Sequence, residues 1–179
     1  KTDTEVIIKM YRKYGHECVK YFNGMFSFAL WDKNKQTLFC ARDRLGIKPF
    51  FYTWYKERFY FSSEIKSLLT IGIEKEPNYK IINKYLCDGI YDHSEETFFK
   101  NIYQLPAGKY ILLNNNKFII SKYWDLSSIN ENNDFNFDAN NNEFNIAKEE
   151  FISLLKSSIS LRLRSDVPVG VNVSGGVDS

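Results

Sequence analysis

The stretch that decides the fold of most of the chain is Met25-Phe26-Ser27-Phe28-Ala29-Leu30-Trp31, followed after a polar turn by Thr37-Leu38-Phe39-Cys40-Ala41. The residue pattern here has a period of two, which predicts two strands joined at Asp32–Gln36. A second hairpin is predicted from Phe50–Tyr55 and Phe59–Phe61, turning at Lys56-Glu57-Arg58. Two further strands, Lys109–Leu113 and Phe118–Trp124, are expected to turn on Asn114-Asn115-Asn116.

Helices are predicted around these strands. The string Thr2-Asp3-Thr4-Glu5 fits a capping box, in which Thr2 caps a helix and Glu5 reaches back. Apolar residues at helical spacing continue to Tyr14, and Gly15 is a plausible stop. The other predicted helices are a short one through Cys18 and Phe22, one beginning near Glu64 and capped by Ser62 or Ser63, and one from about Tyr79 to Leu86 that stops near Gly89.

The composition changes after the last of these strands. Residues Ser127–Asn145 are rich in Asn, Asp and Ser, which indicates a low-complexity insertion or linker. An amphipathic helix is predicted from about Ala147 to Leu163, and Val167–Val173 is predicted to be a buried strand. A helix, a strand and a glycine turn would begin a new α/β unit.

The chain ends on Ser174-Gly175-Gly176-Val177-Asp178-Ser179. Two glycines permit positive φ angles, and successive backbone N–H groups in such a turn form a concavity for anions. The string is not a Walker A loop, because no Gly-Lys-Ser/Thr follows, and it is not a nucleophile elbow, because Asn172 stands where a glycine would be required. A phosphate cradle and an ordinary strand–turn both remain open at this point.

The length and charge narrow the class of protein. A chain of 179 residues can hold one domain and part of another. The 24 Lys and Arg residues exceed the 22 Asp and Glu residues by only two, so charge gives no reason to expect nucleic acid or a membrane as partner. Cys18, Cys40 and Cys87 are odd in number and widely spaced, which favours reduced thiols and a cytoplasmic location. Lys1, followed directly by a helix-start signal, suggests that the chain begins inside a larger protein.

Five strings agree with one known family: Asn23-Gly24-Met25-Phe26-Ser27-Phe28-Ala29-Leu30-Trp31-Asp32, Ala41-Arg42-Asp43-Arg44-Leu45-Gly46-Ile47-Lys48-Pro49-Phe50, Phe61-Ser62-Ser63-Glu64-Ile65-Lys66-Ser67-Leu68, Tyr103-Gln104-Leu105-Pro106-Ala107-Gly108-Lys109 and Lys122-Tyr123-Trp124-Asp125. Together they resemble the latter half of a class II glutamine amidotransferase domain. The terminal string resembles the pyrophosphate-binding loop of ATP pyrophosphatases. The combination is similar to glutamine-hydrolysing asparagine synthetase, over nearly the whole chain except Ser127–Asn145.

This resemblance implies an α+β fold, the C-terminal half of a four-layer αββα amidotransferase sandwich, in residues 1–126. An Asn-rich linker or insertion would occupy 127–145, and a doubly wound α/β synthetase domain would begin in 146–179. In the family, an amino-terminal cysteine attacks the glutamine amide and a tunnel carries the ammonia to the second domain. There ATP adenylates the side-chain carboxylate of aspartate, ammonia displaces AMP, and pyrophosphate is released.

The expected cofactors are therefore ATP and Mg²⁺, because the triphosphate needs charge neutralisation. The expected partners are the small molecules glutamine, aspartate and ATP, with neither nucleic acid nor membrane, and a homo-oligomer is left open.

The site residues carried over from the resemblance fall at the two ends of the chain. Asp3 matches the acidic residue that receives the α-amino group of glutamine, although it could instead only favour the helix dipole. The pyrophosphate loop is matched by Ser174, Gly175, Gly176, Asp178 and Ser179. Asn172 and Val173 match the strand whose backbone reaches the adenine, and no metal-binding residue is assigned.

Three other features are given structural roles. Arg42-Asp43-Arg44 is expected to form an internal ion pair that fastens the loop between hairpins rather than a catalytic group. Cys18 and Cys40 lie inside predicted elements and are expected to be inert buried thiols. His16 and His93 stand apart in sequence and are expected at the surface.

The nucleophilic cysteine, a substrate-binding arginine and the oxyanion-hole residues of the family would all precede Lys1. The isolated chain is therefore expected neither to hydrolyse glutamine nor to make asparagine. Two alternatives remain: another amidotransferase-type ligase that makes an amide or lactam on a different carboxylate, and an inactive binding module on the same scaffold.

Overall fold

A computed structural model describes residues 2–115, 117–128 and 142–176. The chain divides into two compact units, Lys1–Ile129 and Asn130–Ser179, which are described separately. No helix among the described residues is both long enough and apolar enough to cross a lipid bilayer.

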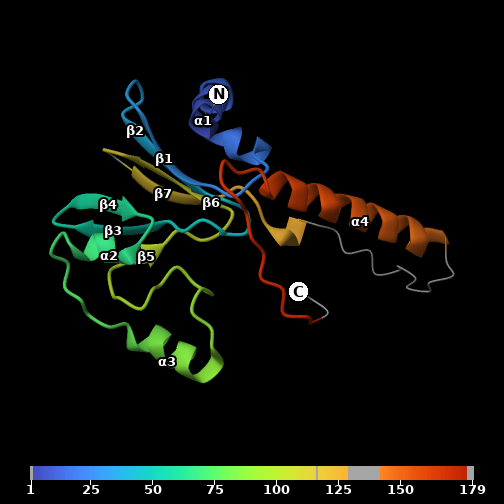
Figure 1. The fold of residues 1–179 in the computed structure, drawn as a ribbon. Helices are drawn as coiled ribbons and strands as arrows, with labels where there is room; N and C mark the ends of the chain where they lie inside the picture. The colour runs from blue at the N-terminus through green and yellow to red at the C-terminus, as the bar shows by residue number, and fades with distance from the viewer. Residues whose placement is uncertain (1, 116, 129–141, 177–179) are drawn as a thin grey trace. The chain divides into compact units, whose positions relative to one another are not determined.

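The first unit contains two antiparallel sheets (Figure 1). Sheet A has the strand order β1-β2-β6-β7, formed by β1 (Ser27–Asp32), β2 (Thr37–Arg42), β6 (Lys109–Asn114) and β7 (Lys117–Lys122). Sheet B has the order β4-β3-β5, formed by β3 (Phe51–Tyr55), β4 (Arg58–Ser62) and the short β5 (Tyr103–Gln104). The three hairpins predicted from the sequence are confirmed, each with its strand ends shifted by a few residues.

Helical segments accompany the sheets of this unit, and α1 (Asp3–Tyr14) is the first of them. The hydroxyl of Thr2 accepts a hydrogen bond from the Glu5 amide at 3.4 Å, so the predicted cap is confirmed. The Glu5 carboxylate instead pairs with Lys9 at 2.7 Å. Helix α1 is followed by the 3-10 helix η1 (Gly15–Tyr21), α2 (Ile65–Leu69), α3 (Tyr79–Asp88) and the short 3-10 helix η2 (Leu126–Ser128).

The expected ends of these helices are largely observed. Gly15 ends α1 with φ +60°, and Gly89 ends α3 in the left-handed conformation. The segment through Cys18 is a 3-10 helix rather than an α-helix. The predicted cap of α2 by Ser62 or Ser63 is wrong, because Glu64 occupies the N-cap position; the hydroxyl of Ser62 accepts a hydrogen bond from the Glu64 amide at 3.2 Å instead.

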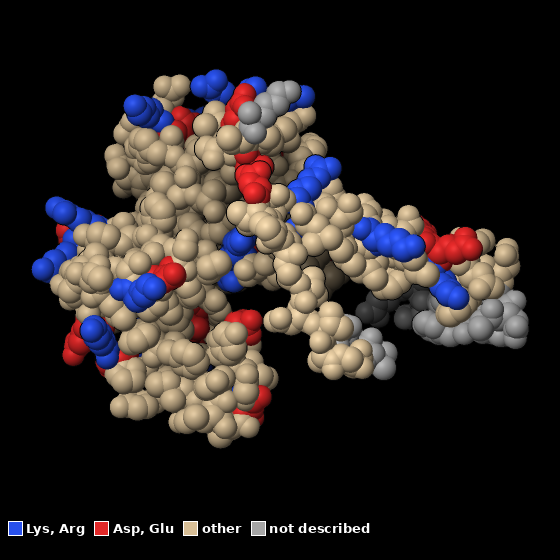
Figure 2. All heavy atoms as spheres, in the orientation of Figure 1, with Lys and Arg blue, Asp and Glu red and all other residues tan. Residues whose placement is uncertain are grey.

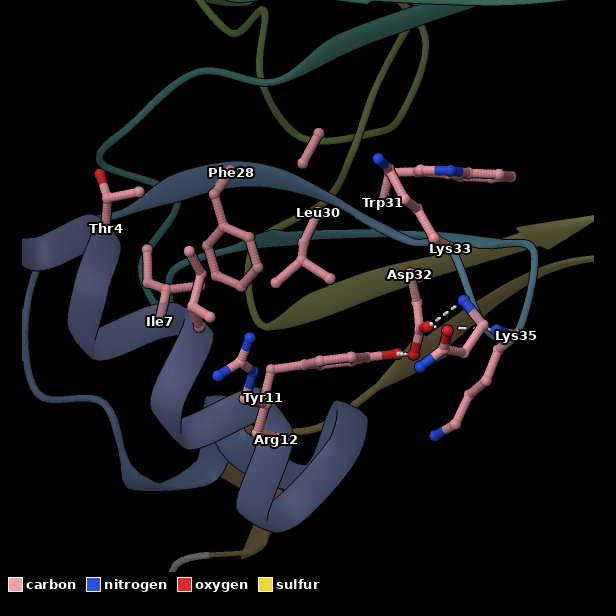
Figure 3. A pocket seen from close by; sticks show the side chains of 13 residues that line it. Thr4, Ile7, Tyr11, Arg12, Phe28, Leu30, Trp31, Asp32, Lys33 and Lys35 are labelled. Carbon is pink, nitrogen blue, oxygen red and sulfur yellow. Dashed lines mark hydrogen bonds between the residues drawn. The ribbon is translucent and has the colours of Figure 1, made fainter.

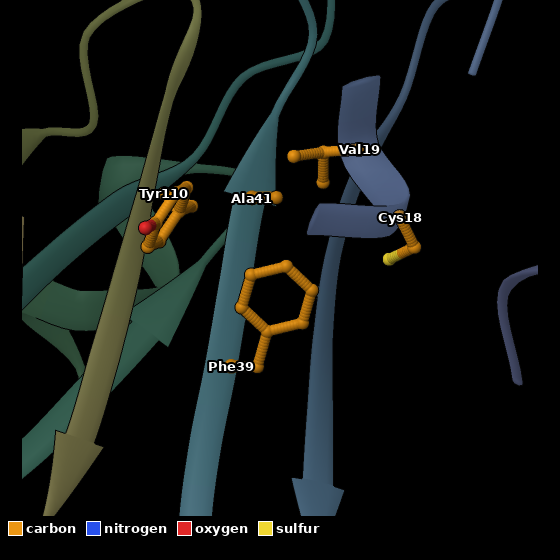
Figure 4. Close-up of a cluster of buried hydrophobic side chains, with 5 residues drawn as sticks. All are labelled: Cys18, Val19, Phe39, Ala41 and Tyr110. Carbon is orange, nitrogen blue, oxygen red and sulfur yellow. The ribbon is translucent and has the colours of Figure 1, made fainter. Parts of the chain in front are cut away.

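The core of this unit consists of three apolar clusters. The first joins α1 and η1 to one face of sheet A around Phe39, which contacts Cys18, Val19, Ala41 and Tyr110 (Figure 4). The second lies between the sheets and includes Cys40 and Ile111 from sheet A and Tyr52 from sheet B. The third packs α2 on sheet B through Leu68 and Ile102. Because neighbouring residues of β2 point to opposite faces, Phe39 and Cys40 belong to different clusters.

The second unit contains α4 (Asn142–Arg162). The helix predicted at Ala147–Leu163 is confirmed but begins five residues earlier. Phe151, Leu155 and Ile159, which were predicted to form its apolar face, are all exposed.

The buried strand predicted at Val167–Val173 is not observed. These residues have irregular backbone, and Val171 is 76 % exposed. A strand needs a hydrogen-bonded neighbour, and no strand pairing within the described residues involves this segment. A β-branched run therefore does not form a strand here without a partner.

Candidate functional site

Asp3 is the first residue of α1, and its carboxylate is exposed at the positive end of the helix. No cation of the described residues lies within ion-pair distance of it. The side chain is therefore open to a ligand, and an ionised carboxylate in such a position can bind an ammonium group through charge-assisted hydrogen bonds.

A groove of about 810 Å³ runs between α1 and β1, and Asp3 is not among the residues that line it (Figure 3). Its helical wall includes Thr4, Ile7 and Ile8, and its other wall is the strand from Phe28 to Asp32. Phe28 and Leu30 point toward α1, so the groove has an apolar floor. Arg12, Lys33 and Lys35 stand on its rim.

A hydrogen bond between Tyr11 and Asp32 crosses the far end of the groove. The Tyr11 hydroxyl donates to Asp32 Oδ2 at 3.0 Å, while the amides of Asn34 and Lys35 donate to Asp32 Oδ1 at 3.0 and 3.1 Å. The Lys35 amide, then the Tyr11 hydroxyl and the Asn34 amide, lower the pKa of Asp32. Partial burial and the neighbouring carboxylate raise the pKa of Tyr11 to about 12, so Tyr11 is a hydrogen-bond donor at neutral pH.

The loop after β2 is fastened by a buried carboxylate. Asp43 is only 2 % exposed, and its oxygens accept hydrogen bonds from the backbone amides of Leu45, Ile47, Lys48 and Phe26 at 3.0–3.3 Å. The guanidinium of Arg42 donates to the carbonyls of Lys48, Leu105 and Gly46 at 2.6–2.8 Å, and that of Arg44 donates to the carbonyls of Phe22 and Lys20.

The predicted internal ion pair is therefore wrong, although the predicted fastening role of this segment is correct. Neither arginine lies within 4.0 Å of the Asp43 carboxylate. In a tight loop, backbone N–H and C=O groups outnumber side-chain partners. They therefore form the hydrogen bonds of Arg42, Asp43 and Arg44 separately.

The cysteines of the described residues do not provide an evident nucleophile. Cys18 and Cys40 are buried, and burial raises the pKa of the Cys18 thiol to about 11 and that of Cys40 to about 12. Both are therefore protonated at neutral pH, and the thiolate is the reactive form. Cys87 is exposed on α3.

The candidate phosphate loop lies in the second unit. Asn172, Val173, Ser174, Gly175 and Gly176 are all exposed, and Gly175 adopts φ +79°. Positive φ at this glycine suits the backbone concavity that binds anions. Asp178 and Ser179 lie outside the described residues.

The sequence predicts Asp3 as a site residue but does not predict the groove between α1 and β1. Tyr11 falls within the helix predicted from Thr2 to Tyr14 and Asp32 at the start of a predicted turn, and the contact between them spans 21 positions. Local periodicity carries no signal for such a contact. No group of three His, Cys, Asp or Glu residues in the described part of the chain is arranged to hold a metal ion.

Comparison with known proteins defines the class to which this arrangement belongs. The family model described as "Glutamine amidotransferase domain" matches residues 1–124, and the chain belongs to this family. A second family model, described as "Asparagine synthase", matches residues 150–179.

Individual relatives agree with both matches. The chain is 41 % identical to the "Putative asparagine synthetase [glutamine-hydrolyzing] 2" of Methanocaldococcus jannaschii, over 99 % of this chain and 34 % of that protein. It is 38 % identical to the "Asparagine synthetase [glutamine-hydrolyzing] 2" of Bacillus subtilis and 34 % identical to "Amidase chry2" of Gibberella zeae, over 99 % of this chain and 24 % and 25 % of those proteins. The chain thus spans about a quarter to a third of the length of these relatives.

Proposed function

We propose that residues 1–126 form the C-terminal part of a class II glutamine amidotransferase domain with a four-layer αββα architecture. Residues 127–145 would be a linker or insertion, and residues 146–179 would begin an ATP-dependent synthetase domain of the doubly wound α/β class. The three apolar clusters, which join a helix to each sheet and the sheets to each other, support the layered arrangement. The family matches at 1–124 and 150–179 support the order of the two domains.

The proposed activity is glutamine-dependent asparagine synthesis, in which ammonia released from glutamine amidates aspartate at the expense of ATP. The observation that carries this proposal is the succession of an amidotransferase match and an asparagine-synthase match along one chain. The names of the relatives from M. jannaschii and B. subtilis state the same pair of activities. A cytoplasmic location accompanies this proposal.

In the first unit, Asp3 would bind the α-ammonium group of glutamine. Its exposed carboxylate has no competing cation among the described residues, and Thr2 fixes the helix start that presents it. Cys18 and Cys40 take no part in hydrolysis in this proposal, because burial keeps both thiols protonated.

In the second unit, Ser174, Gly175 and Gly176 would bind the phosphates of ATP, with Asp178 and Ser179 continuing the same loop and Asn172 and Val173 beside the adenine. A hydroxyl, two glycine amides and the positive φ of Gly175 suit an anionic ligand. When bound, ATP supplies the leaving group that makes the aspartate carboxylate reactive. Mg²⁺ would enter with the triphosphate, whose charge it neutralises.

The test uses the longest polypeptide encoded around these residues and measures asparagine formation with ATP, aspartate and either glutamine or ammonia. Asp3→Asn should raise the KM for glutamine by about 10-fold or more, because it removes one charged hydrogen-bond partner. The ammonia-dependent rate should stay unchanged. Glu5→Gln, in the same helical turn but paired with Lys9, is the matched control. Equal loss with both nitrogen sources would contradict the assignment of Asp3.

A second candidate is an amide ligase that acts on another carboxylate, because one relative of the chain, "Amidase chry2", is not named as an asparagine synthetase. A screen of carboxylate acceptors with the same polypeptide separates the two candidates. Glutamine-dependent amidation of another acid, but not of aspartate, would replace the first proposal with the second.

A further inference from the structure

Tyr11 ties α1 to sheet A through both its ring and its hydroxyl. The ring stacks on that of Phe39 in β2, with the centroids 5.5 Å apart and an angle of 25° between the planes. The hydroxyl donates to Asp32 Oδ2 at 3.0 Å (Figure 3), and the ammonium of Lys35 lies 5.7 Å from the ring centroid. The stacking holds α1 against the sheet, and the hydrogen bond fixes where α1 lies along β1.

The acceptor at the end of β1 is itself held in place. Asp32 Oδ1 accepts hydrogen bonds from the amides of Asn34 and Lys35, and Asp32 pairs with Thr37 across the hairpin. These bonds orient the whole carboxylate, so Oδ2 is a fixed acceptor. The bond to Tyr11 therefore positions α1 on the sheet, rather than the carboxylate on the helix.

The same helix carries Asp3 at its other end. The side chains of α1 that pack on the apolar cluster around Phe39 are Met10, Tyr11 and Tyr14, in the second half of the helix. Asp3 precedes Tyr11 by eight residues, which is about 12 Å along the helix axis. A tilt of the helix by about 5° at Tyr11 would therefore move Asp3 by about 1 Å. Such a displacement of a substrate-positioning group can lower a rate by as much as about 100-fold.

The position of a single carboxylate is important because the substrate proposed for it has no net charge. Free glutamine carries one ammonium group and one carboxylate, so a long-range field contributes little to its binding. On the visible face, Lys and Arg side chains are interspersed with Asp and Glu (Figure 2). Recognition of the ammonium group then depends on where Asp3 is held.

We propose that Tyr11 is a positioning residue for glutamine binding, because its hydrogen bond to Asp32 holds α1 where Asp3 meets the α-ammonium group. This inference rests on the proposed function and deepens it by adding two residues, Tyr11 and Asp32, to the support of the glutamine site. Neither residue contacts the substrate in this proposal, and both act through Asp3.

The test measures glutamine-dependent and ammonia-dependent asparagine formation by the longest polypeptide encoded around these residues. Tyr11→Phe keeps the ring that stacks on Phe39 and removes only the hydroxyl. The KM for glutamine should rise about 3- to 10-fold with kcat unchanged, since a displaced Asp3 weakens binding of the substrate and of the transition state alike. The ammonia-dependent reaction, which does not use Asp3, should keep its rate.

Tyr14→Phe is the matched control, because it removes a hydroxyl from the same helix where the ring stacks on Tyr21 of η1. Its KM for glutamine should stay within about 2-fold of the wild type. Should Tyr11→Phe fail to fold, Asp32→Ala breaks the same bond from the strand and should raise KM to a similar extent. Asp32→Asn should stay within about 2-fold, because the asparagine carbonyl can accept from the turn amides while its NH₂ group donates to the Tyr11 oxygen.

Combination with Asp3→Asn distinguishes positioning from a general loss of structure. Asp3 and Tyr11 lie about 12 Å apart along the helix, so independent effects of the two substitutions would multiply. If Tyr11 acts through Asp3, Tyr11→Phe should change KM by less than about 2-fold in the Asp3→Asn protein.

Three results would overturn the positioning role and leave the proposed function intact: effects that multiply, an equal loss with ammonia, or a KM for Tyr11→Phe equal to that for Tyr14→Phe. Absence of glutamine-dependent amidation in the wild type would instead overturn the proposed function, and the positioning role with it.

Discussion

At the scale of single residues, the Asp43 carboxylate holds together the loop after β2. It accepts four backbone hydrogen bonds while almost fully buried. Asp43→Asn replaces one carboxylate oxygen, an acceptor, with an NH₂ group, a donor. The backbone amides that donated hydrogen bonds to that oxygen then face another N–H group. We expect a loss of about 2–4 kcal/mol in the free energy of unfolding, because each unsatisfied buried donor costs about 1–3 kcal/mol. Urea unfolding of the purified chain measures this loss.

Asp88→Asn is the matched control for that experiment. Asp88 is exposed at the end of α3, and a surface change of this kind should alter the stability by no more than about 0.5 kcal/mol. If the two variants lose the same stability, the four hydrogen bonds to Asp43 do not stabilise the fold as argued.

Tyr11 provides a pH-dependent prediction. Its pKa is raised from the ordinary value of 10.0 to about 12, chiefly by burial and then by its hydrogen bond to Asp32. Folding therefore favours the neutral phenol, so its contribution is complete below pH 10 and is lost as the pH rises from 10 to 12. Tyr11→Phe should lower the free energy of unfolding by about 0.5–1.5 kcal/mol at pH 7, because the hydrogen bond is lost. The decrease in stability at alkaline pH that ionisation of Tyr11 causes should be absent from this variant.

Thermal unfolding of the wild type and of Tyr11→Phe between pH 7 and 11.5 checks this prediction. The difference in melting temperature between the two proteins should shrink above pH 10. A difference that stays constant would show that Tyr11 does not ionise later in the folded state than in the unfolded chain. Tyr52 and Tyr123, whose pKa values burial also raises, are unchanged in this comparison.

At the scale of elements, Gly108 is the point where β6 begins against the end of β7. Its φ is +65°, and a Cβ added there would lie 2.6 Å from the Trp124 carbonyl oxygen. Its amide donates to the Asp43 carbonyl at 2.9 Å, and its carbonyl accepts from Tyr123 at 2.9 Å. Gly108→Ala should cost more than about 2 kcal/mol, because left-handed strain alone costs about 1–3 kcal/mol and a clash with backbone is added to it.

Gly24→Ala is the control for Gly108, since a Cβ at Gly24 meets nothing within 4 Å and its φ is not positive. Denaturant midpoints of the two variants give the comparison. A Gly108→Ala protein as stable as Gly24→Ala would mean that β6 and β7 can separate at this end without loss of stability.

The elements also show which features could be predicted from the sequence. The hairpins were predictable because their alternation and their turn residues lie within about fifteen positions of each other. Residues Val167–Val173 have the same β-branched composition but no pairing strand among the described residues, and composition cannot supply a partner. The position of Asp3 followed from a local capping pattern. The groove did not, because it requires α1 and β1 to meet in space.

At the scale of the whole molecule, the two units should differ in local stability. Phe39, Cys40 and Ile111 in the first unit are completely buried in central strands of sheet A. In the second unit, no residue of α4 is buried, and its apolar side chains are exposed. Most of the stability of helices in proteins comes from tertiary packing, so α4 is expected to be less stable than the packed elements of the first unit.

We therefore expect the amides of β2 and β6 to be protected from hydrogen exchange in the purified chain. The free energy of opening measured for them should reach the free energy of global unfolding. The amides of α4 should exchange at least about 100-fold faster, since their opening requires no loss of packing. Residues Tyr79–Asp88 of α3 are an internal reference, because that helix buries Ile81 and should show intermediate protection. Protection of α4 equal to that of β2 would mean that its apolar side chains are packed in solution, against the exposure that the structure assigns to them.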